Sequence, residues 1–339
     1  MKLIRTEDAV GHVLCHDMTQ IIKDKYKDAR FRKGHVVTEE DIPVLLSMGK
    51  EHLYVWEMTP GMVHENDAAE RLLTLCGQEN MLRSEVKEGK IELKAACDGV
   101  FLVDSARLVA VNSQDEVMIA TRKGGMAVRE GDKLAGMRVI PLIIEEEKLR
   151  KAEQAAGDKP LLSLKPYVRK TACIVATGGE VKKGLIKDTF TPVVIDKLKT
   201  YGIETLEVVY SGDGVENVRD AVLAMRERKP DMILCTGGMS VDPDDNTPGG
   251  IKAAGANIIA YGAPVLPGAM FLLGYFDDGM PVMGLPGCVM YAGATVFDLV
   301  LPKIAADVPV TRADLAALGE GGLCLGCKPC HYPICPFGK

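Results

Sequence analysis

The second half of the chain alternates between apolar segments of strand length and amphipathic segments, and this pattern restricts the fold more than any other feature. Residues 171–177 form a nearly continuous apolar run, as in a strand covered on both faces, and 205–210 and 231–236 are similar runs. Between them, 191–201 and 215–225 carry apolar residues at helical spacing. Strand–helix–strand units with short links predict an α/β fold with a mostly parallel sheet, whose ligand site lies at the carboxyl ends of the strands.

The rest of the chain gives weaker signals. Residues 39–48 and 67–77 have the apolar spacing of helices, and 53–57 is a short apolar run that predicts a strand. Short alternating runs over 91–144, among them 107–112, predict β-hairpins.

A charged segment separates these regions from the α/β half. Residues 145–154 are either a helix or a solvated connector, and Gly157, Pro160 and Pro166 follow it, so we expect the main boundary there. The predicted regions are an N-terminal α+β region, a β-rich region with the charged connector, the α/β domain and a cysteine-rich tail, over residues 1–80, 81–160, 165–310 and 311–339.

Composition narrows the range of partners and compartments. The 339 residues include 41 basic and 47 acidic side chains, a net charge of −6, so no nucleic-acid partner is expected. No run of about 18 apolar residues is present and the first residues are charged, so we expect neither a membrane span nor a signal peptide. The cytoplasm is the expected compartment.

Glycine and acidic residues follow each of the three predicted strands, at 177–180, 211–214 and 236–250. Glycine pairs let backbone amides approach an anion, and Thr247 with Pro248 predicts a helix start there. Carboxylates such as those of Asp242, Asp244 and Asp245 are ligands that Mg²⁺ prefers beside phosphate. Turns use the same residue types, and for the first two loops a turn is the favoured interpretation. The density of glycine and aspartate in the third loop favours a phosphorylated ligand with a divalent ion.

The third loop, 236–248, reads TGGMSVDPDDNTP and resembles the signature of the molybdopterin-binding domain shared by molybdopterin adenylyltransferases and molybdenumtransferases. The matching positions are Gly237, Gly238, Ser240, Asp245, Thr247 and Pro248. Further positions that match the family's ligand loops are Thr177, Gly178, Gly179, Glu180, Asp188 and Asp213, followed by Pro286 and Gly287 in the segment 284–304. Four motifs in the family's order over about 140 residues make this a specific resemblance.

The resemblance implies a three-layer α/β/α domain that binds molybdopterin in molybdenum cofactor biosynthesis. It implies that adenylylated molybdopterin and Mg²⁺ bind at Asp245, Asp242, Asp213 and the Gly237–Gly238 turn, with Asp245 and Asp213 as catalytic residues. Molybdate would then be inserted with release of AMP, which makes the protein a transferase.

The N-terminal half resembles the molybdenumtransferases only in part. Residues 7–20 and 31–57 are similar to two stretches of their N-terminal half, but the acidic Asp-Gly-Tyr-Ala segment between those stretches is missing. A non-catalytic molybdopterin carrier, chaperone or sensor that docks onto a molybdoenzyme is therefore the alternative. The family's oligomeric relatives also imply a homo-oligomer.

Four of the ten cysteines crowd into the C-terminal tail: Cys324, Cys327, Cys330 and Cys335. Their spacing approaches that of a ferredoxin run, and four thiolates, with His331 in reserve, also suit a tetrahedral Zn²⁺ site. We therefore predict a zinc or iron–sulfur centre, with a flexible, reduced tail as the alternative.

Overall fold

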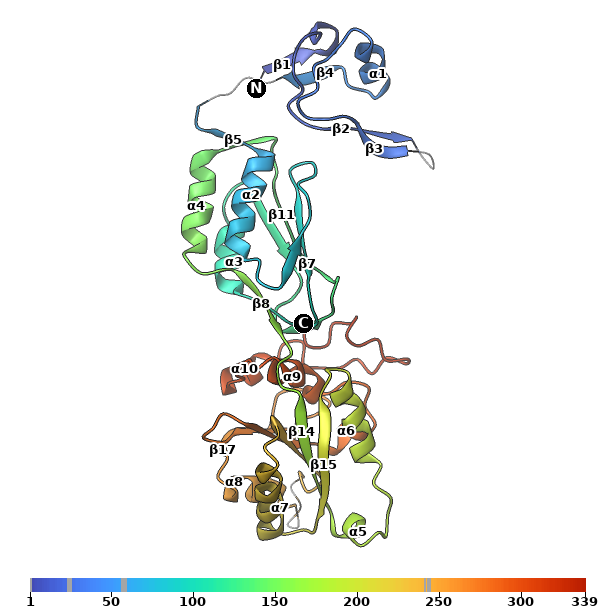
Figure 1. The fold of residues 1–339 in the computed structure, drawn as a ribbon, viewed down its shortest axis with the longest axis vertical. Coiled ribbons are helices and arrows are strands. Elements are labelled where there is room, and N and C mark those ends of the chain that lie inside the picture. The colour runs from blue at the N-terminus through green and yellow to red at the C-terminus, as the bar shows by residue number, and fades with distance from the viewer. Residues whose placement is uncertain (1, 23–25, 56–59, 241, 243–244) are drawn as a thin grey trace. The chain divides into compact units, whose positions relative to one another are not determined.

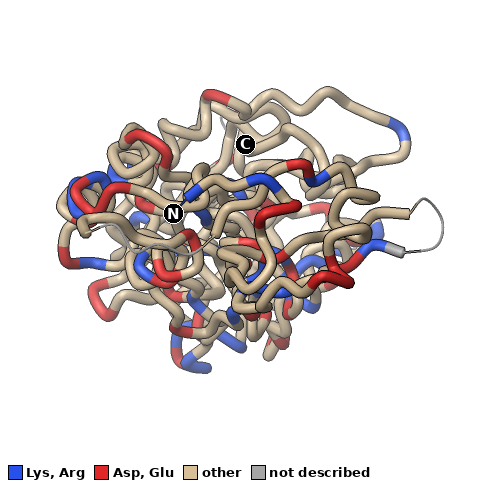
Figure 2. Tube along the Cα trace, turned by 90° about the horizontal axis from the view of Figure 1, so that it is seen from above, with Lys and Arg blue, Asp and Glu red and all other residues tan. Residues whose placement is uncertain are grey.

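The structure is a computed structural model, and it describes residues 2–22, 26–55, 60–240, 242 and 245–339. The chain forms two compact units. The first unit comprises residues 1–96, 103–122 and 131–163, and the second comprises 97–102, 123–130 and 164–339. Within the described ranges, no helix is both long enough and apolar enough to span a lipid bilayer. Basic and acidic residues are mixed along the chain trace (Figure 2).

The first unit begins with a small β-rich region. Its strands are β1 (Lys2–Arg5), β2 (Met18–Ile22), β3 (Tyr26–Phe31) and β4 (His52–Val55), with the short helices η1 (Thr6–Asp8) and α1 (Asp41–Ser47). β1 pairs with β4 and β2 with β3, both antiparallel, around a core that includes Leu14, Leu45 and Leu53. The predicted helix at 39–48 and strand at 53–57 are confirmed as α1 and β4, except that positions 56 and 57 lie outside the described residues.

The remainder of the first unit is a four-stranded antiparallel sheet with three helices. The elements are β5 (Met62–His64), α2 (Glu65–Cys76), β6 (Met81–Arg83), β7 (Ile91–Ala95), α3 (Ser105–Asn112), β9 (Val117–Thr121), β11 (Lys133–Val139), β12 (Ile143–Glu145) and α4 (Glu146–Ala156). The sheet order is β6-β7-β11-β9, and β5 pairs with β12. The charged segment 145–154 is a packed helix, because Leu149 and Ala152 of α4 are buried.

One prediction in this unit is wrong: residues 107–112 form helix α3 and not a strand. The Asp104 carboxylate accepts a hydrogen bond from the Arg107 amide and caps the helix. The Arg107 guanidinium also binds the carbonyls of Ala156 and Pro160, which fixes the first turn of α3 to the segment after α4. The apolar run alone does not distinguish a strand from a helix of this length.

The second unit is built on a six-stranded sheet in the order β15-β14-β16-β19-β18-β17. These strands are β14 (Thr171–Thr177), β15 (Glu204–Ser211), β16 (Met232–Thr236), β17 (Asn257–Tyr261), β18 (Leu272–Tyr275) and β19 (Pro281–Leu285). The first four in this order are parallel, whereas β18 and β17 are antiparallel to their neighbours. The predicted mostly parallel sheet is confirmed, and the three strands read from the sequence are β14, β15 and β16.

Helices cover both faces of this sheet (Figure 1). They are α6 (Phe190–Lys199), α7 (Val215–Glu227), α8 (Thr247–Ala253), α9 (Val296–Ala305) and α10 (Arg312–Ala317), with the short α5 (Gly179–Lys182) and η2 (Gly287–Met290). Cys173 and Val175 of β14 share a core with α7 and α8, and Ala172 and Ile174 share a core with α6 and α9. The domain is therefore a three-layer α/β/α sandwich, as expected.

The C-terminal tail is folded as part of the second unit. Phe337 is 2% exposed and belongs to the same buried cluster as residues of α6 and α9. Tyr332 donates a hydrogen bond from its hydroxyl to the Asp298 carbonyl, at 3.0 Å, and Leu323 forms an isolated β-bridge with Leu266. The alternative of a flexible tail does not agree with these contacts.

The remaining strands, β8 (Gly99–Val103), β10 (Met126–Val128) and β13 (Leu162–Pro166), form a separate small sheet.

Candidate functional site

Four loops of the second unit meet at the carboxyl ends of the parallel strands. They follow β14, β15, β16 and β19, which are neighbours in the sheet, so the loops at 178–189, 212–214, 237–246 and 286–295 share one end of the domain. Helix α5 marks this end in Figure 1, opposite the C-terminus of the chain. All the ligand positions expected from the resemblance lie in or next to these loops.

Two buried threonines connect the first and third loops. The Thr177 hydroxyl donates to the carbonyl of Thr236 at 3.0 Å and lies 3.1 Å from the Thr247 hydroxyl. Thr247, which is 1% exposed, donates in turn to the carbonyl of Gly237 at 2.9 Å. This network fixes the position at which the third loop turns away from β16.

The packing of the protein itself requires glycine at positions 237 and 238. A Cβ on Gly237 would lie 2.3 Å from the carbonyl oxygen of Thr177, and one on Gly238 would lie 2.6 Å from the Thr247 hydroxyl. Both residues also have positive φ, +83° and +56°. Only glycine lets the loop pack against β14 in this way. None of the described residues accepts a hydrogen bond from either amide, which leaves both able to bind an oxyanion.

Asp213 connects the second loop to the first. Its Oδ2 accepts a hydrogen bond from the Gly179 amide at 2.9 Å, and a Cβ on Gly179 would lie 2.8 Å from the same oxygen. The preceding amide, of Gly178, donates to the Ser211 carbonyl. Ser211 and Asp213 thus satisfy the amides of Gly178 and Gly179, and Asp213 has a structural contact in addition to any ligand it binds. Glu180, in α5, is exposed.

Asp188 caps the helix that follows the first loop. Its Oδ1 accepts hydrogen bonds from the amides of Phe190 and Thr191, at 2.9 and 3.0 Å. Partial burial opposes ionisation, but the hydrogen bonds from Thr191 and Phe190, together with the neighbouring Tyr210 hydroxyl, outweigh it and lower the pKa of the carboxyl. The sequence analysis missed Tyr210, whose pKa is raised by desolvation and by the charge of Asp188. Tyr210 lies one residue before the end of β15, and this position near a strand end is the feature by which the sequence could have indicated it.

The acidic part of the third loop is held by its own backbone. Asp245 Oδ2 accepts a hydrogen bond from the Ser240 amide at 2.7 Å, and the Asp245 amide donates to the carbonyl of Asp242 at 2.9 Å. The Tyr261 hydroxyl donates to the Met239 carbonyl, also at 2.9 Å, and desolvation followed by the charge of Asp245 raises its pKa. Tyr261 was not foreseen from the sequence. Asp244 lies outside the described residues.

Pro286 and Gly287 begin the fourth loop, directly after β19. Pro286 is buried and precedes η2, whereas Gly287 is exposed and a Cβ on it would meet nothing within 4 Å. At the other end of η2, Met290 accepts a hydrogen bond on sulfur from the Thr189 hydroxyl at 3.1 Å. The fourth loop is thereby joined to the start of α6, next to Asp188.

The cysteines of the tail are divided between two environments. Cys324 and Cys335 are half-buried and pack against the core beneath α9, whereas Cys327 and Cys330 are exposed. Across the part of the chain that the structure describes, no three His, Cys, Asp or Glu side chains lie together in a group able to hold a metal ion.

The domain that carries these four loops matches a family model. Residues 173–306 match the family model described as "Probable molybdopterin binding domain", which confirms the resemblance for this domain. Residues 3–57 match a second family model, a domain of unknown function, DUF8806.

Curated relatives match only a short part of the chain. A CinA-like protein of Mycobacterium tuberculosis is 33% identical over 76 residues, 22% of this chain and 18% of the relative. A CinA-like protein of Petrotoga mobilis is 32% identical over 76 residues. The chain thus spans less than a fifth of the length of these relatives.

Solved structures also match about two fifths of this chain. MogA is 22% identical with a TM-score of 0.36 and matches 41% of this chain and 100% of its own. The molybdopterin biosynthesis enzyme MoaB of Thermus thermophilus is 16% identical with a TM-score of 0.34, and the match covers 42% of this chain and 98% of that chain.

Proposed function

We propose that the second unit binds molybdopterin or its adenylylated form at the four loops and that the protein acts in molybdenum cofactor biosynthesis. The observation that carries the proposal is the junction of the loops by Thr177, Thr247 and Asp213, which brings separate sequence motifs to one end of the sheet. The amides of Gly237 and Gly238 are the groups we assign to an anionic part of the ligand.

The activity we propose is molybdate insertion with release of AMP. Asp245 and Asp213 are the proposed catalytic residues, and Asp242 with Asp245 would hold Mg²⁺. One Asp245 oxygen accepts a hydrogen bond from the Ser240 amide, which orients the carboxylate. No described residue donates a hydrogen bond to the second oxygen, and we assign that oxygen to the cation. Mg²⁺ is commonly held by one or two carboxylates together with substrate phosphates, so two aspartates suffice. When bound, the ion would offset phosphate charge.

A non-catalytic carrier, chaperone or sensor is the second candidate. The observation that favours it is the missing Asp-Gly-Tyr-Ala segment, which leaves the first unit without that acidic motif. In this case a molybdoenzyme would be the partner and the ligand loops would bind molybdopterin without AMP release. Either function would place the protein in the cytoplasm, where its thiols stay reduced. A homo-oligomer also remains a proposal. The zinc or iron–sulfur centre expected in the tail has no support from the described residues, because no three candidate ligands lie together in a group there.

The deciding experiment supplies the full chain with adenylylated molybdopterin, molybdate and Mg²⁺ and measures AMP. We expect Asp245→Asn to reduce AMP release on the order of 100-fold, with a smaller loss in Asp213→Asn. Asp277→Asn is the matched control, because Asp277 is an exposed aspartate in the turn between β18 and β19, away from the four loops.

Binding is measured separately, by fluorescence titration with molybdopterin. Binding without AMP release would identify the carrier. Release by Asp245→Asn within about twofold of wild type would show that Asp245 is not catalytic. A folded chain that neither binds molybdopterin nor releases AMP would contradict both candidates.

A further inference from the structure

The cysteine-rich tail contains a loop that is fixed at both ends. At its start, the Cys324 amide donates to the Leu266 carbonyl at 2.8 Å, and the Leu266 amide donates to the Gly322 carbonyl at 2.8 Å. At its end, Tyr332 is bound to the backbone of Asp298 and packs edge-on against Phe337, with ring centroids 6.2 Å apart. Residues 325–331 therefore project from a fixed base.

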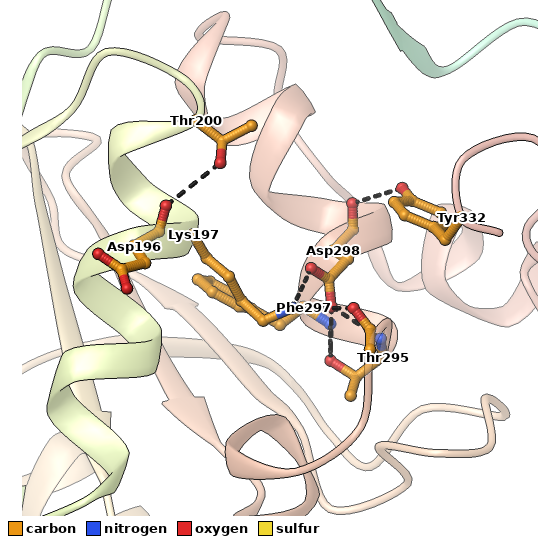
Figure 3. A network of polar contacts seen from close by, with 8 residues as sticks. Asp196, Lys197, Thr200, Thr295, Phe297, Asp298 and Tyr332 are labelled. Atoms are coloured by element: carbon orange, nitrogen blue, oxygen red, sulfur yellow. Dashed lines mark hydrogen bonds and ion pairs between the residues drawn. The ribbon is translucent and has the colours of Figure 1, made fainter. Parts of the chain in front are cut away.

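The base itself is a polar network between α6 and α9 (Figure 3). The Lys197 ammonium binds Asp298, whose Oδ2 accepts from the amide and the hydroxyl of Thr295 at 2.7 and 3.1 Å. Lys197 also donates to the Gly293 carbonyl at 3.3 Å. Because both charges are largely shielded from solvent and satisfied by several partners, they hold α6 and α9 together. Pro302, four residues after Asp298 in α9, has no N–H to donate, which leaves the Asp298 carbonyl for Tyr332.

Two thiols are presented by the loop, and two are not. Cys327 and Cys330 are exposed and three residues apart, whereas Cys324 and Cys335 pack against the core. Cys330 rests on the backbone of Gly293, since a Cβ added there would lie 2.8 Å from both its Cβ and its Sγ. The four-cysteine set read from the sequence thus separates into an exposed pair and two half-buried residues.

Metal ions differ in the number of protein ligands that they require, and this number determines which ion a pair of thiolates can hold. Zn²⁺ in structural sites takes four ligands, and iron–sulfur clusters take four thiolates. The described residues place no third His, Cys, Asp or Glu side chain with this pair in a group able to hold a metal. Thiolates are soft ligands that select Cu(I), and this closed-shell ion is satisfied by two of them.

We propose that Cys327 and Cys330 form a two-thiolate site for Cu(I). On binding, each thiol loses its proton, two Cu–S bonds form and two protons enter the solvent, with no change in the oxidation state of copper or sulfur. The complex carries one negative charge, and the exposed Lys328 between the two cysteines places a positive charge beside it. This proposal does not depend on the pterin-binding function.

The test is an anaerobic titration of the reduced full chain with Cu(I), in competition with a colorimetric Cu(I) chelator. We expect one Cu(I) per chain that the competitor does not remove, and a loss of affinity of at least about tenfold in Cys327→Ser/Cys330→Ser. Cys324→Ala/Cys335→Ala is the matched control and should retain the ion. Sulfur-only, two-coordinate copper in X-ray absorption would give the ligand number directly.

Three results would overturn the proposal. Equal affinity in Cys327→Ser/Cys330→Ser and wild type would place the copper on other thiols. Loss of metal in both double variants, with zinc or iron in the purified protein, would establish a four-ligand centre instead. Failure of the folded, reduced chain to compete for Cu(I) would show that the pair binds none. Circular dichroism of each variant confirms that its fold is intact.

Discussion

The loop after β16 and the C-terminal tail are both rich in glycine, proline and potential ligands, yet they are organised in opposite ways. In the loop, the residues that form the sequence motif also form the structural contacts: Gly237 and Gly238 pack on Thr177 and Thr247. In the tail, Phe337 and Tyr332 make the contacts, and the exposed cysteines of the motif make few of them.

This difference separates two kinds of sequence signal. A glycine pair after a strand indicates a steric requirement. Neighbouring residues of the same domain leave no room there for a Cβ, so the fold depends on glycine at both positions. A run of cysteines indicates only that the segment can bind a ligand such as a metal ion. Exposed thiols contribute little to the stability of the fold until a ligand connects them. Mutations of the motif should therefore damage the loop, whereas only mutations of the anchors should damage the tail.

Gly237→Ala tests the loop and should have the largest effect. The added Cβ would lie 2.3 Å from the Thr177 carbonyl oxygen, and the alanine would have to adopt a φ of +83°. We therefore expect a loss of about 3 kcal/mol in the free energy of unfolding. Gly255→Ala is the control, because Gly255 also has positive φ, +91°, but nothing lies within 4 Å of its added Cβ. It should lose about 1 kcal/mol. Equal losses in urea unfolding would show that φ alone, and not packing on Thr177, requires Gly237.

Phe337→Ala tests the tail. The ring is buried in a cluster with residues of α6 and α9, so its removal should weaken tail docking by about 2 to 3 kcal/mol, and Cys335 should react faster with a thiol reagent. Ile334→Ala is the control, since Ile334 is 87% exposed and should change stability by less than about 0.5 kcal/mol. An unchanged rate of thiol labelling in Phe337→Ala would mean that the cysteines, and not the aromatic anchors, organise the tail.

Much of the fold of the second unit could be predicted because its strands and helices are locally specified. The apolar run 171–177 coincides with β14, and Thr247 with Pro248 begins α8 as expected. The antiparallel edge formed by β17 and β18 was not foreseen, since strand direction depends on pairing across the sheet and not on local pattern. For the same reason 107–112 could not be distinguished from a strand without its tertiary contacts.

The candidate site was predicted at the level of motifs but not of contacts. The strand-end rule placed Asp213 and Asp245 at one end of the sheet, the family resemblance added Asp188, and all three lie at that end in the structure. Tyr210, beside Asp188, and Tyr261, which donates to the Met239 carbonyl, lie on other elements, and no spacing rule connects them to the motifs. The burial of Phe337, close to the end of the chain, likewise results from tertiary packing alone.

Thr247→Val examines the hydrogen bonds of the loop separately from its packing. Valine keeps the shape of threonine but removes the hydroxyl that donates to Gly237 and lies beside Thr177, which leaves buried polar groups unsatisfied. We expect a loss of about 1 to 2 kcal/mol in urea unfolding. Thr200→Val, which removes an exposed hydroxyl bound to a helix carbonyl at 3.2 Å, is the control and should lose only a few tenths of a kcal/mol. Similar losses in both would mean that the glycines alone fix the loop.

Asp188→Asn should give the smallest effect, and its signature is a dependence on pH. The pKa of Asp188 is lower in the folded chain than its ordinary value, because hydrogen bonds to the carboxylate outweigh desolvation. A carboxyl with a depressed pKa stabilises the fold above its unfolded pKa, about 3.9, and this contribution is lost as the pH falls through the lower, folded value. The stability of wild type minus that of Asp188→Asn should therefore be positive at pH 6 and shrink towards zero below about pH 4. Solvent screening of the half-exposed group keeps this difference below about 1 kcal/mol. Urea unfolding of both proteins from about pH 3 to pH 7 measures it, and a difference that stays constant across this range would show that Asp188 acts through neutral hydrogen bonds and not through its charge.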